Sequence, residues 1–310
     1  MSDTPASTAS PIPARFGAGV MSFFSDFPEL VKARLTMLVL MTTGSGFLLA
    51  WKPGVDGWLF FHVLLGTAGV VAGAAVLNEL LEIRQDARMM RTRERPLPAG
   101  RIEPRDALFI GVLLAGLGLA YLYMNINPLT MLMAAASLFI YLFVYTPLKR
   151  VSVWNTLVGA VPGALPPVIG WTAARDAIDV ECLLFFGLQF CWQMPHFLAI
   201  AWFARHEYEK GGFRMITAVD ADGKWTAGLS LAHTLCLIPL TVMVFFVGDA
   251  SWIFVVGATA LAVWYVRPAV AFMRVRDDAK ARSLFLVSLI YLPAMYAVGI
   301  LDRVLDRLLF

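Results

Sequence analysis

Nine apolar stretches of roughly 20 residues each run through this chain, and they restrict its fold more than any other feature. Lipid offers no hydrogen-bond partner to an open backbone, and the alternation typical of a β-barrel is absent, so we expect every stretch to be a helix. The predicted fold class is an all-α polytopic membrane protein, with about nine transmembrane helices bundled around a central cavity open to the cytoplasmic side. The stretches lie near residues 35–51, 58–82, 107–123, 128–147, 154–172, 182–204, 226–247, 251–267 and 283–301.

Composition excludes the main alternatives to a membrane protein. Of the 310 residues, 59% are hydrophobic and 15% are charged, whereas a soluble domain carries about 25% charged residues. The chain is therefore too apolar for a soluble globule or a disordered segment. Its three cysteines stand in apolar runs without a Cys-x-x-Cys pair, which predicts neither disulfides nor a zinc site. We expect a lipid bilayer as its surroundings and no nucleic acid as a partner.

The basic residues predict the orientation of the chain. If the N-terminus is cytoplasmic, 21 of the 25 Lys and Arg residues fall on the cytoplasmic side and four on the other. Cytoplasmic loops carry such an excess, and one helix more or fewer would invert every later loop. Nine helices, a cytoplasmic N-terminus and a C-terminus across the membrane therefore support one another. Residues 1–28 are polar and are predicted to form a flexible cytoplasmic tail, before a single transmembrane domain at 29–310.

An acidic stripe closes the second apolar stretch. Asn78, Glu82 and Asp86 follow one another at intervals of four residues, which places them on one face of a helix. A carboxylate near the membrane boundary is costly unless it is paired or bound to a metal. Oxygen donors of this kind suit Mg²⁺, which binds one or two carboxylates together with phosphate oxygens. The alternative is an amphipathic helix end whose acids pair with Arg84 and Arg88.

An arginine-rich segment follows directly, and it contains Arg91, Arg95 and Arg101. Guanidinium groups match phosphate oxygens in pairs, and the Pro-Leu-Pro-Ala-Gly run at residues 96–100 stiffens the backbone before a tight turn. Carboxylates that can bind Mg²⁺ lie beside arginines that can bind phosphate oxygens. This combination favours a diphosphate-binding site. The alternative is a loop that holds the topology or contacts anionic lipid.

A third cytoplasmic segment contains Tyr145, Lys149, Arg150 and Asn155. Lys149 and Arg150 would close on a diphosphate from another loop, while Asn155 stands where a helix is expected to begin. Helix capping together with retention of the topology is the alternative for this segment.

The sixth stretch contains an intramembrane histidine, His196, shortly after Gln193. Such a residue is a functional candidate by default, and three roles are open: a haem-iron ligand, a proton acceptor or a hydrogen-bonded packing residue. Pro195 kinks the helix, which commonly marks a cavity. Glu207 follows His196 by 11 residues, about three helical turns, so both can face one cavity.

In this order along the chain, the four segments resemble the UbiA superfamily of intramembrane prenyltransferases, and in particular its haem-modifying branch. The superfamily's Asn-x3-Asp-x3-Asp motif appears here with Glu82 in the middle position, and the Asp-Tyr of a later motif appears as Glu207-Tyr208. The runs that look specific to the haem-modifying branch are residues 91–101 and 192–197, and residues 145–150 together with Asn155 resemble the family as well.

The resemblance implies transfer of a farnesyl group from farnesyl diphosphate to the vinyl group of haem b, which gives haem O in a bacterial inner (plasma) membrane. It implies Mg²⁺, or Mn²⁺, held by Asn78, Glu82, Asp86 and Glu207. It also implies that Tyr145 bonds a phosphate oxygen or takes a proton, and that His196 ligates the haem iron or orients the ring. Further catalytic or substrate-binding residues would be Arg91, Arg95, Arg101, Lys149, Arg150, Asn155 and Gln193.

Two other functions stay open. Prenylation of an aromatic acid for quinone synthesis would predict a second Asp-rich run where this chain has Gln193, His196 and Glu207. A membrane transporter of an anionic or lipid substrate would predict ionisable groups along a path through the membrane, whereas here they gather on one side. The resemblance further implies haem A synthase or oxidase-assembly proteins as partners.

Overall fold

The computed structural model describes residues 25–309, and in that part of the chain nine helical segments are long and apolar enough to cross a membrane. The predicted fold class and helix count are confirmed for these residues. Of the predicted tail, residues 25–28 begin a short helix, and the remainder lies outside the described residues. The spanning segments are α2 (Ala33–Ala50), α3 (Trp58–Asp86), α4 (Pro104–Asn125), the run α5–η1–α6 (Pro128–Leu148), α7 (Asn155–Arg175), α8 (Val180–Phe203), α10 (Lys224–Val247), α11 (Trp252–Arg274) and α12 (Asp278–Leu309).

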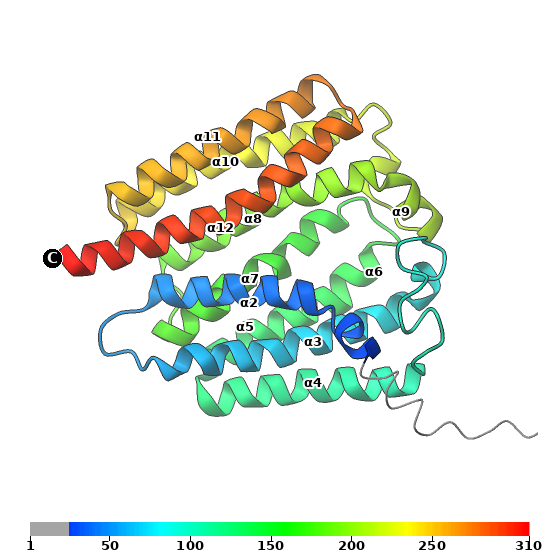
Figure 1. Ribbon diagram of the computed structural model, residues 1–310, viewed down its shortest axis with the longest axis horizontal. Helices are drawn as coiled ribbons and strands as arrows, with labels where there is room; N and C mark the ends of the chain where they lie inside the picture. Colours follow the sequence, from blue (N-terminus) through cyan, green and yellow to red (C-terminus); the bar gives the residue numbers. More distant parts are fainter. Residues whose placement is uncertain (1–24, 310) are drawn as a thin grey trace, which may run out of the picture.

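The long helices lie side by side in one bundle, with α10 and α11 at one edge and α4 at the other (Figure 1). Helix α7 is the most deeply buried, with 72% of its apolar window inside the protein. It packs closely against α2 because Gly46 and Gly170 stand at their crossing. A methyl group on either glycine would overlap a carbonyl oxygen of the partner helix. Small residues at such crossings let helices approach in lipid, where packing drives association.

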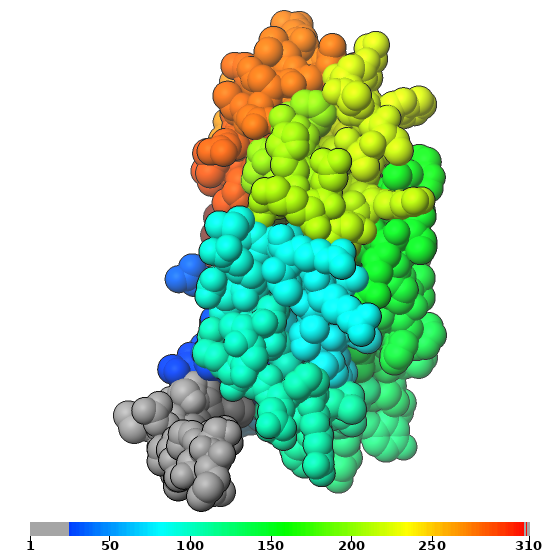
Figure 2. Space-filling model, turned by 90° about the vertical axis from the view of Figure 1, so that its right-hand side faces the viewer, coloured from blue at the N-terminus to red at the C-terminus, as the bar shows by residue number. Residues whose placement is uncertain are grey.

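Helix α3 continues four residues beyond its predicted end at residue 82, to Asp86. The whole acidic stripe is therefore helical. It ends where the chain turns into the loop of residues 87–103, which contains the arginines. A short helix that the sequence did not predict, α9 (Arg205–Gly211), lies beside this loop. Figure 2 looks onto this end of the molecule, where the loop after α3 (cyan) meets the α9 segment (yellow-green).

The fourth span changes its winding before it ends. After α5 (Pro128–Phe139) the chain forms a π-helix, η1 (Ile140–Tyr145), and then the single turn α6 (Thr146–Leu148). Pro147 lacks an N–H, which interrupts the regular ladder of backbone hydrogen bonds. The hydroxyl of Thr146 donates to the carbonyl of Tyr141, five residues earlier, over 2.8 Å. π-Helical turns are rare and occur frequently at functional sites.

Two cavities lie at opposite ends of the bundle. One of about 220 Å³ adjoins α9 at the end of the acidic stripe, and one of about 310 Å³ adjoins Lys52 and Arg175 at the other end. A central cavity open to the cytoplasmic side stays a prediction.

Candidate active site

The acidic stripe of α3 is buried, and a basic side chain contacts each of its three members. Asn78, Glu82 and Asp86 are exposed by only 2%, 4% and 2%. Lys32 Nζ donates to Asn78 Oδ1 over 2.8 Å. Lys149 Nζ lies 2.9 Å and 3.0 Å from the two carboxylate oxygens of Glu82. Arg95 Nη1 lies 2.7 Å from Asp86 Oδ2. The side-chain oxygens of one helix are thus paired with basic side chains from three separate parts of the chain.

Sequence reasoning did not assign a role to Lys32. This residue precedes α2 and has a left-handed backbone, with φ of 48°, a conformation that costs a non-glycine residue about 1–3 kcal/mol and tends to cluster at active sites and ligand clamps. Burial, together with the positive charges of Arg95 and Lys149, lowers the pKa of Lys32 to about 8. The sequence offers one signal for it, a lysine directly before an apolar span, and that signal by itself indicates only the orientation of the chain.

Glu79 is a second residue that sequence reasoning missed. It is fully buried, its Oε1 accepts a hydrogen bond from the backbone N–H of Leu97 over 3.3 Å, and its Oε2 has no hydrogen-bond partner among the described residues. A buried polar atom without a partner is unusual and calls for an explanation. Through Leu97, Glu79 holds the Pro-Leu-Pro-Ala-Gly run against α3, which positions Arg95 beside Asp86.

The predicted arginines do not all point to the acidic stripe. Only Arg95 contacts it. Arg101 instead pairs with Asp26, at 3.0 Å, and with Glu29, at 3.6 Å, in the helical turn that precedes α2. Arg91 is exposed. Gly100 has a φ of 71°, which confirms the predicted tight turn.

Tyr145 and Lys149 are brought to the stripe by the end of the fourth span. Lys149 Nζ lies 4.7 Å from the centre of the Tyr145 ring, and Thr146 accepts a hydrogen bond from Asn78 Nδ2 over 3.1 Å. The ring of Tyr145 packs on α7 at Gly159, where a Cβ atom would lie 2.5 Å from it. The end of the fourth span therefore places an ammonium, a phenol and a hydroxyl group beside Asn78 and Glu82 of α3.

The side chains of Arg150 and Asn155 donate hydrogen bonds to backbone carbonyl groups. Arg150 Nη2 donates to the carbonyl of Leu81. The Asn155 amide donates over 2.7 Å to the carbonyls of both Ser152 and Arg214. These contacts connect α3, the start of α7 and the segment after α9. Asn155 is the first residue of α7, which begins without a side-chain capping hydrogen bond, so the capping alternative for Asn155 is wrong. The substrate-binding roles of Arg150 and Asn155 stay predictions.

Gln193 and His196 face different neighbours of α8. Gln193 donates over 2.6 Å to the carbonyl of Ala160 on α7. His196 Nδ1 lies 2.7 Å from Ser288 Oγ on α12, and its ring lies between those of Trp192 and Phe285, at centroid distances of 5.3 Å and 4.9 Å. His196 therefore belongs to an aromatic cluster between α8 and α12. The described contacts do not join it to the acidic stripe.

Glu207 is engaged with α9 and with the loop after α3. Its Oε2 accepts from the backbone N–H of Met90 over 2.7 Å, and its Oε1 lies 3.0 Å from Lys210 Nζ. These hydrogen bonds, from Lys210 first and from Met90 next, lower the pKa of Glu207. Among the described residues, no group of three or more His, Cys, Asp or Glu side chains is arranged to hold a metal ion. The four predicted metal ligands are thus not gathered in one cluster.

The donor set on α3 nevertheless fits a divalent cation that arrives with a phosphate. One amide oxygen and two carboxylates lie on one buried face, and Mg²⁺ is commonly bound by one or two carboxylates, with substrate phosphates and water in the remaining positions. Lys32, Lys149 and Arg95 already stand on these oxygens, and cations so placed are well suited to phosphate oxygens.

Comparison with known proteins places this geometry in a family. The UbiA prenyltransferase family matches residues 39–291. Proteins named protoheme IX farnesyltransferase are similar over most of the chain. That of Solibacter usitatus is 38% identical over 90% of this chain and 98% of its own, and that of Myxococcus xanthus is 41% identical over 90% and 95%.

Solved structures share the fold at low sequence identity. A digeranylgeranylglyceryl phosphate synthase has a TM-score of 0.77 at 14% identity, covering 91% of this chain and 99% of its own. A UbiA homolog from Archaeoglobus fulgidus, solved with DMAPP and Mg²⁺, has a TM-score of 0.66 at 17% identity, covering 88% and 99%. The matched family, the extent of the relatives and the shared fold agree: the chain belongs to the UbiA prenyltransferase family.

Proposed function

We propose that this membrane enzyme transfers the farnesyl group of farnesyl diphosphate to the vinyl group of haem b, giving haem O. The observation that carries the proposal is the buried cluster on α3, where Lys32, Lys149 and Arg95 stand on the oxygens of Asn78, Glu82 and Asp86. The names of relatives near 40% identity support the choice of farnesyl diphosphate and haem as substrates.

The cluster supplies what binding a diphosphate requires. Its buried acids lie at the end of a span, so the charged head of the substrate would sit there while the prenyl chain extends among apolar helices. We propose that Lys32, Lys149 and Arg95 move from their present oxygen partners to phosphate oxygens. Because the three cations are already in place, little reorganisation is needed when charge develops on the leaving group.

Asn78, Glu82 and Asp86 would hold the divalent cation, Mg²⁺ first and Mn²⁺ as the alternative. When bound, it neutralises part of the diphosphate charge. Glu207 would join these ligands only by releasing the N–H of Met90. In its present position it instead holds α9 against the loop that contains Arg91, Arg95 and Arg101.

The transfer balances with water as the third reactant. The bond between C1 of the farnesyl group and the diphosphate oxygen breaks, and its electron pair leaves with the diphosphate. The vinyl group forms the new carbon–carbon bond, water adds to the resulting cation, and one proton is lost. The phenol of Tyr145, beside Lys149, would donate to a phosphate oxygen or relay that proton.

Haem b would bind towards α8 and α12, where His196 lies among aromatic rings. Trp192 and Phe285 offer flat apolar surfaces to a porphyrin, and Ser288 fixes one nitrogen of His196. We propose that His196 orients the ring or ligates its iron from this wall, and that Gln193, on the neighbouring face of α8, contacts substrate.

The chain is a multi-pass membrane protein, and the charge bias supports a cytoplasmic N-terminus and a periplasmic C-terminus in a bacterial inner membrane. The acidic cluster would then face the cytoplasm, where soluble diphosphates are made. Haem O would pass to haem A synthase or to an oxidase-assembly protein as partner.

The test is to incubate membranes containing the chain with haem b, Mg²⁺ and either farnesyl or geranylgeranyl diphosphate, and to identify the extracted haems by mass. We expect haem O with farnesyl diphosphate and no product after chelation of divalent cations, with activity restored by added Mg²⁺. Membranes containing Asp86→Asn serve as the matched control. Prenylation of an added aromatic acid in place of haem would replace this proposal by the quinone-synthesis alternative. Loss of substrate from one compartment without product would favour the transporter.

A further inference from the structure

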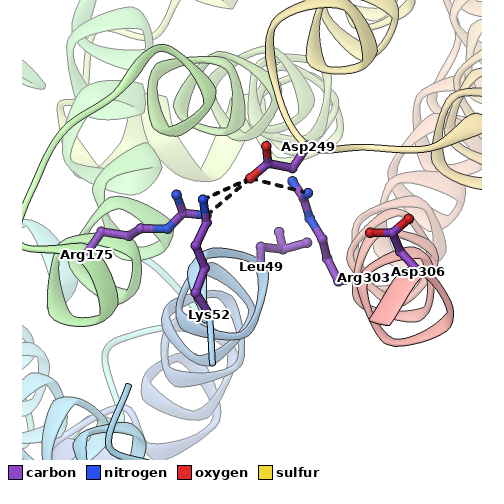
Figure 3. A pocket seen from close by; sticks show the side chains of 6 residues that line it. All are labelled: Leu49, Lys52, Arg175, Asp249, Arg303 and Asp306. Atoms are coloured by element: carbon purple, nitrogen blue, oxygen red, sulfur yellow. Dashed lines mark ion pairs between the residues drawn. The ribbon is translucent and has the colours of Figure 1, made fainter. Parts of the chain in front are cut away.

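The cavity at the opposite end of the bundle from the acidic stripe is lined mainly by charged side chains that the proposed reaction does not use. It has a volume of about 310 Å³. Figure 3 shows Lys52, Arg175 and Arg303 converging on the carboxylate of Asp249, with Asp306 next to Arg303. They come from the ends of α2, α7 and α12 and from the connection between α10 and α11. The lining residues are Leu49, Lys52, Arg175, Asp249, Arg303 and Asp306.

The three cations share one carboxylate oxygen at long distances. Asp249 Oδ2 lies 3.3 Å from Lys52 Nζ, 3.7 Å from Arg175 Nη2 and 4.0 Å from Arg303 Nη1. Strong charge-assisted hydrogen bonds are shorter, at about 2.7–2.9 Å. The donors around this oxygen are therefore only loosely satisfied, and an additional oxyanion in the cavity would satisfy them better.

Two of the cations are held rigidly by other contacts. Arg303 has a side chain only 7% exposed, and its Nη2 pairs with the buried carboxylate of Glu181. Arg175 Nε donates over 2.6 Å to the carbonyl of Ala50. Their remaining N–H groups are thus fixed in position at the cavity. The third cation, Lys52, is half-exposed and can move.

The cavity lies at the level expected for lipid headgroups. Lys52 stands two residues after Ala50, where α2 ends, and Arg175 is the last residue of α7. Trp58 and Trp252, which begin α3 and α11 at this end, are 69% and 68% exposed. Exposed tryptophans mark the boundary between membrane and water, so the charged side chains at this level are within reach of lipid headgroups.

Charges of both signs line the cavity, which argues for a zwitterionic ligand over a simple anion. Asp306 is exposed and makes no ion pair within 4.0 Å with another described side chain. Asp249 is 57% exposed, Glu181 lies behind Arg303, and Asp179 lies 3.9 Å from Arg175. The three cations alone would suit a phosphate, but the acids beside them favour a phosphate that carries its own amine.

We propose that this cavity binds the headgroup of a zwitterionic phospholipid of the phosphatidylethanolamine type. Its phosphate would lie among Lys52, Arg175 and Arg303, and its ammonium would lie at Asp306. A lipid held there would fill the space between α2, α7 and α12 on the side of the membrane away from the acidic stripe.

The test is to reconstitute the full chain in vesicles of equal phosphatidylethanolamine and phosphatidylglycerol, extract it in mild detergent and measure retained lipid by native mass spectrometry. We expect the wild type to retain phosphatidylethanolamine preferentially. Lys52→Gln should retain about tenfold less, as expected for the loss of one charge-assisted contact, and Lys52→Arg should behave as the wild type. Asp306→Asn should lose the preference for phosphatidylethanolamine.

The matched control is Lys280→Gln, which removes the same charge from an exposed position at the other end of α12, and its lipid retention should equal that of the wild type. Equal retention by the wild type and Lys52→Gln would overturn the proposal. So would equal affinity of the wild type for the two lipids. Displacement of the lipid by millimolar inorganic phosphate, with the same dependence on Lys52, would identify a free anion as the ligand instead.

Discussion

The two ends of the bundle both bury charged groups, but they arrange them differently. At the acidic end, oxygen donors from the single helix α3 meet cations that arrive from three other segments. At the opposite end, the contacts join the ends of different helices. Asp302 on α12 accepts hydrogen bonds over 3.0 Å from the N–H groups of Ser251 and Phe254, at the start of α11, and Arg303 on α12 pairs with Glu181 on α8.

The difference separates the proposed reaction site from an end where charged groups connect helix termini and line the proposed lipid cavity. The acidic end keeps a feature that reduces stability, namely the unpartnered oxygen of Glu79, whereas a left-handed non-glycine backbone occurs at both ends, at Lys32 and at Asp176. The opposite end uses its buried charges to hold helix termini together. We therefore expect substitutions at the acidic end to affect mainly activity and those at the opposite end to affect mainly stability.

The largest effect should come from the acidic stripe. Asp86→Asn and Glu82→Gln should each lower the rate of haem O formation by about 10²–10³-fold, as expected for loss of a group that stabilises developing charge. Initial rates in membranes with equal protein content would measure this. Glu94→Gln is the matched control, because Glu94 lies in the same region with a side chain 77% exposed. Full activity of either stripe variant would exclude the proposed role of the stripe.

The next largest effect should be a loss of folding stability when the ion pair at the opposite end is broken. Glu181→Gln removes one partner of a buried ion pair and should lower the free energy of unfolding by about 3 kcal/mol, since the Arg303 charge is left uncompensated. Denaturant unfolding in detergent would measure this, and activity per folded molecule should not change. The double variant Glu181→Gln/Arg303→Met should recover most of the loss. A drop in activity per folded molecule would contradict the division between the two ends.

A smaller effect is expected at Lys32. Lys32→Gln should raise the KM for farnesyl diphosphate about tenfold, because one cation of the diphosphate site is lost. Lys32→Arg keeps the charge and should recover part of the affinity. Lys224→Gln, at a position where the side chain is 67% exposed, is the control and should leave KM unchanged. An unaltered KM in Lys32→Gln would limit Lys32 to a structural contact with Asn78.

The smallest effect should come from Ser288. Ser288→Ala removes one hydrogen bond to His196 and should weaken haem binding about fivefold, the equivalent of roughly 1 kcal/mol, whereas His196→Ala should weaken it further. Haem absorbance per purified chain would measure both. Identical retention in wild type, Ser288→Ala and His196→Ala would assign the histidine to packing.

The sequence predicted the bundle well because bilayer thickness sets the length of each span. It also predicted that Asn78, Glu82 and Asp86 share a face, since helical spacing requires only local geometry. It did not predict which cations would contact them. Lys32 and Lys149 are separated from their partners by 46 and 67 residues, and such pairings depend on how the helices pack.

The assignments of Arg101 and Glu207 show the same limit. Both residues stand in segments whose composition favours phosphate or metal binding, yet Arg101 pairs with Asp26 and Glu207 accepts from Met90. In the sequence, the charges at the opposite end indicate only the topology of the chain. Their convergence on Asp249 joins residues 52, 175, 249 and 303, and no local pattern indicates it.

The π-helix in the fourth span sets the direction in which Tyr145 and Lys149 point, and membrane insertion does not depend on that direction. An α-helix turns by about 100° per residue, and the wider π-turn, with its i→i+5 hydrogen bonds, turns by less, so regular α-helix over Ile140–Tyr145 would rotate everything before it relative to everything after it. Such a segment would still be apolar and long enough to cross the bilayer. The phenol of Tyr145 and the ammonium group of Lys149 would nevertheless point in a new direction. Membrane insertion depends on hydropathy, whereas the proposed chemistry depends on the direction of these side chains. A change of winding at this turn would therefore impair the chemistry without preventing insertion.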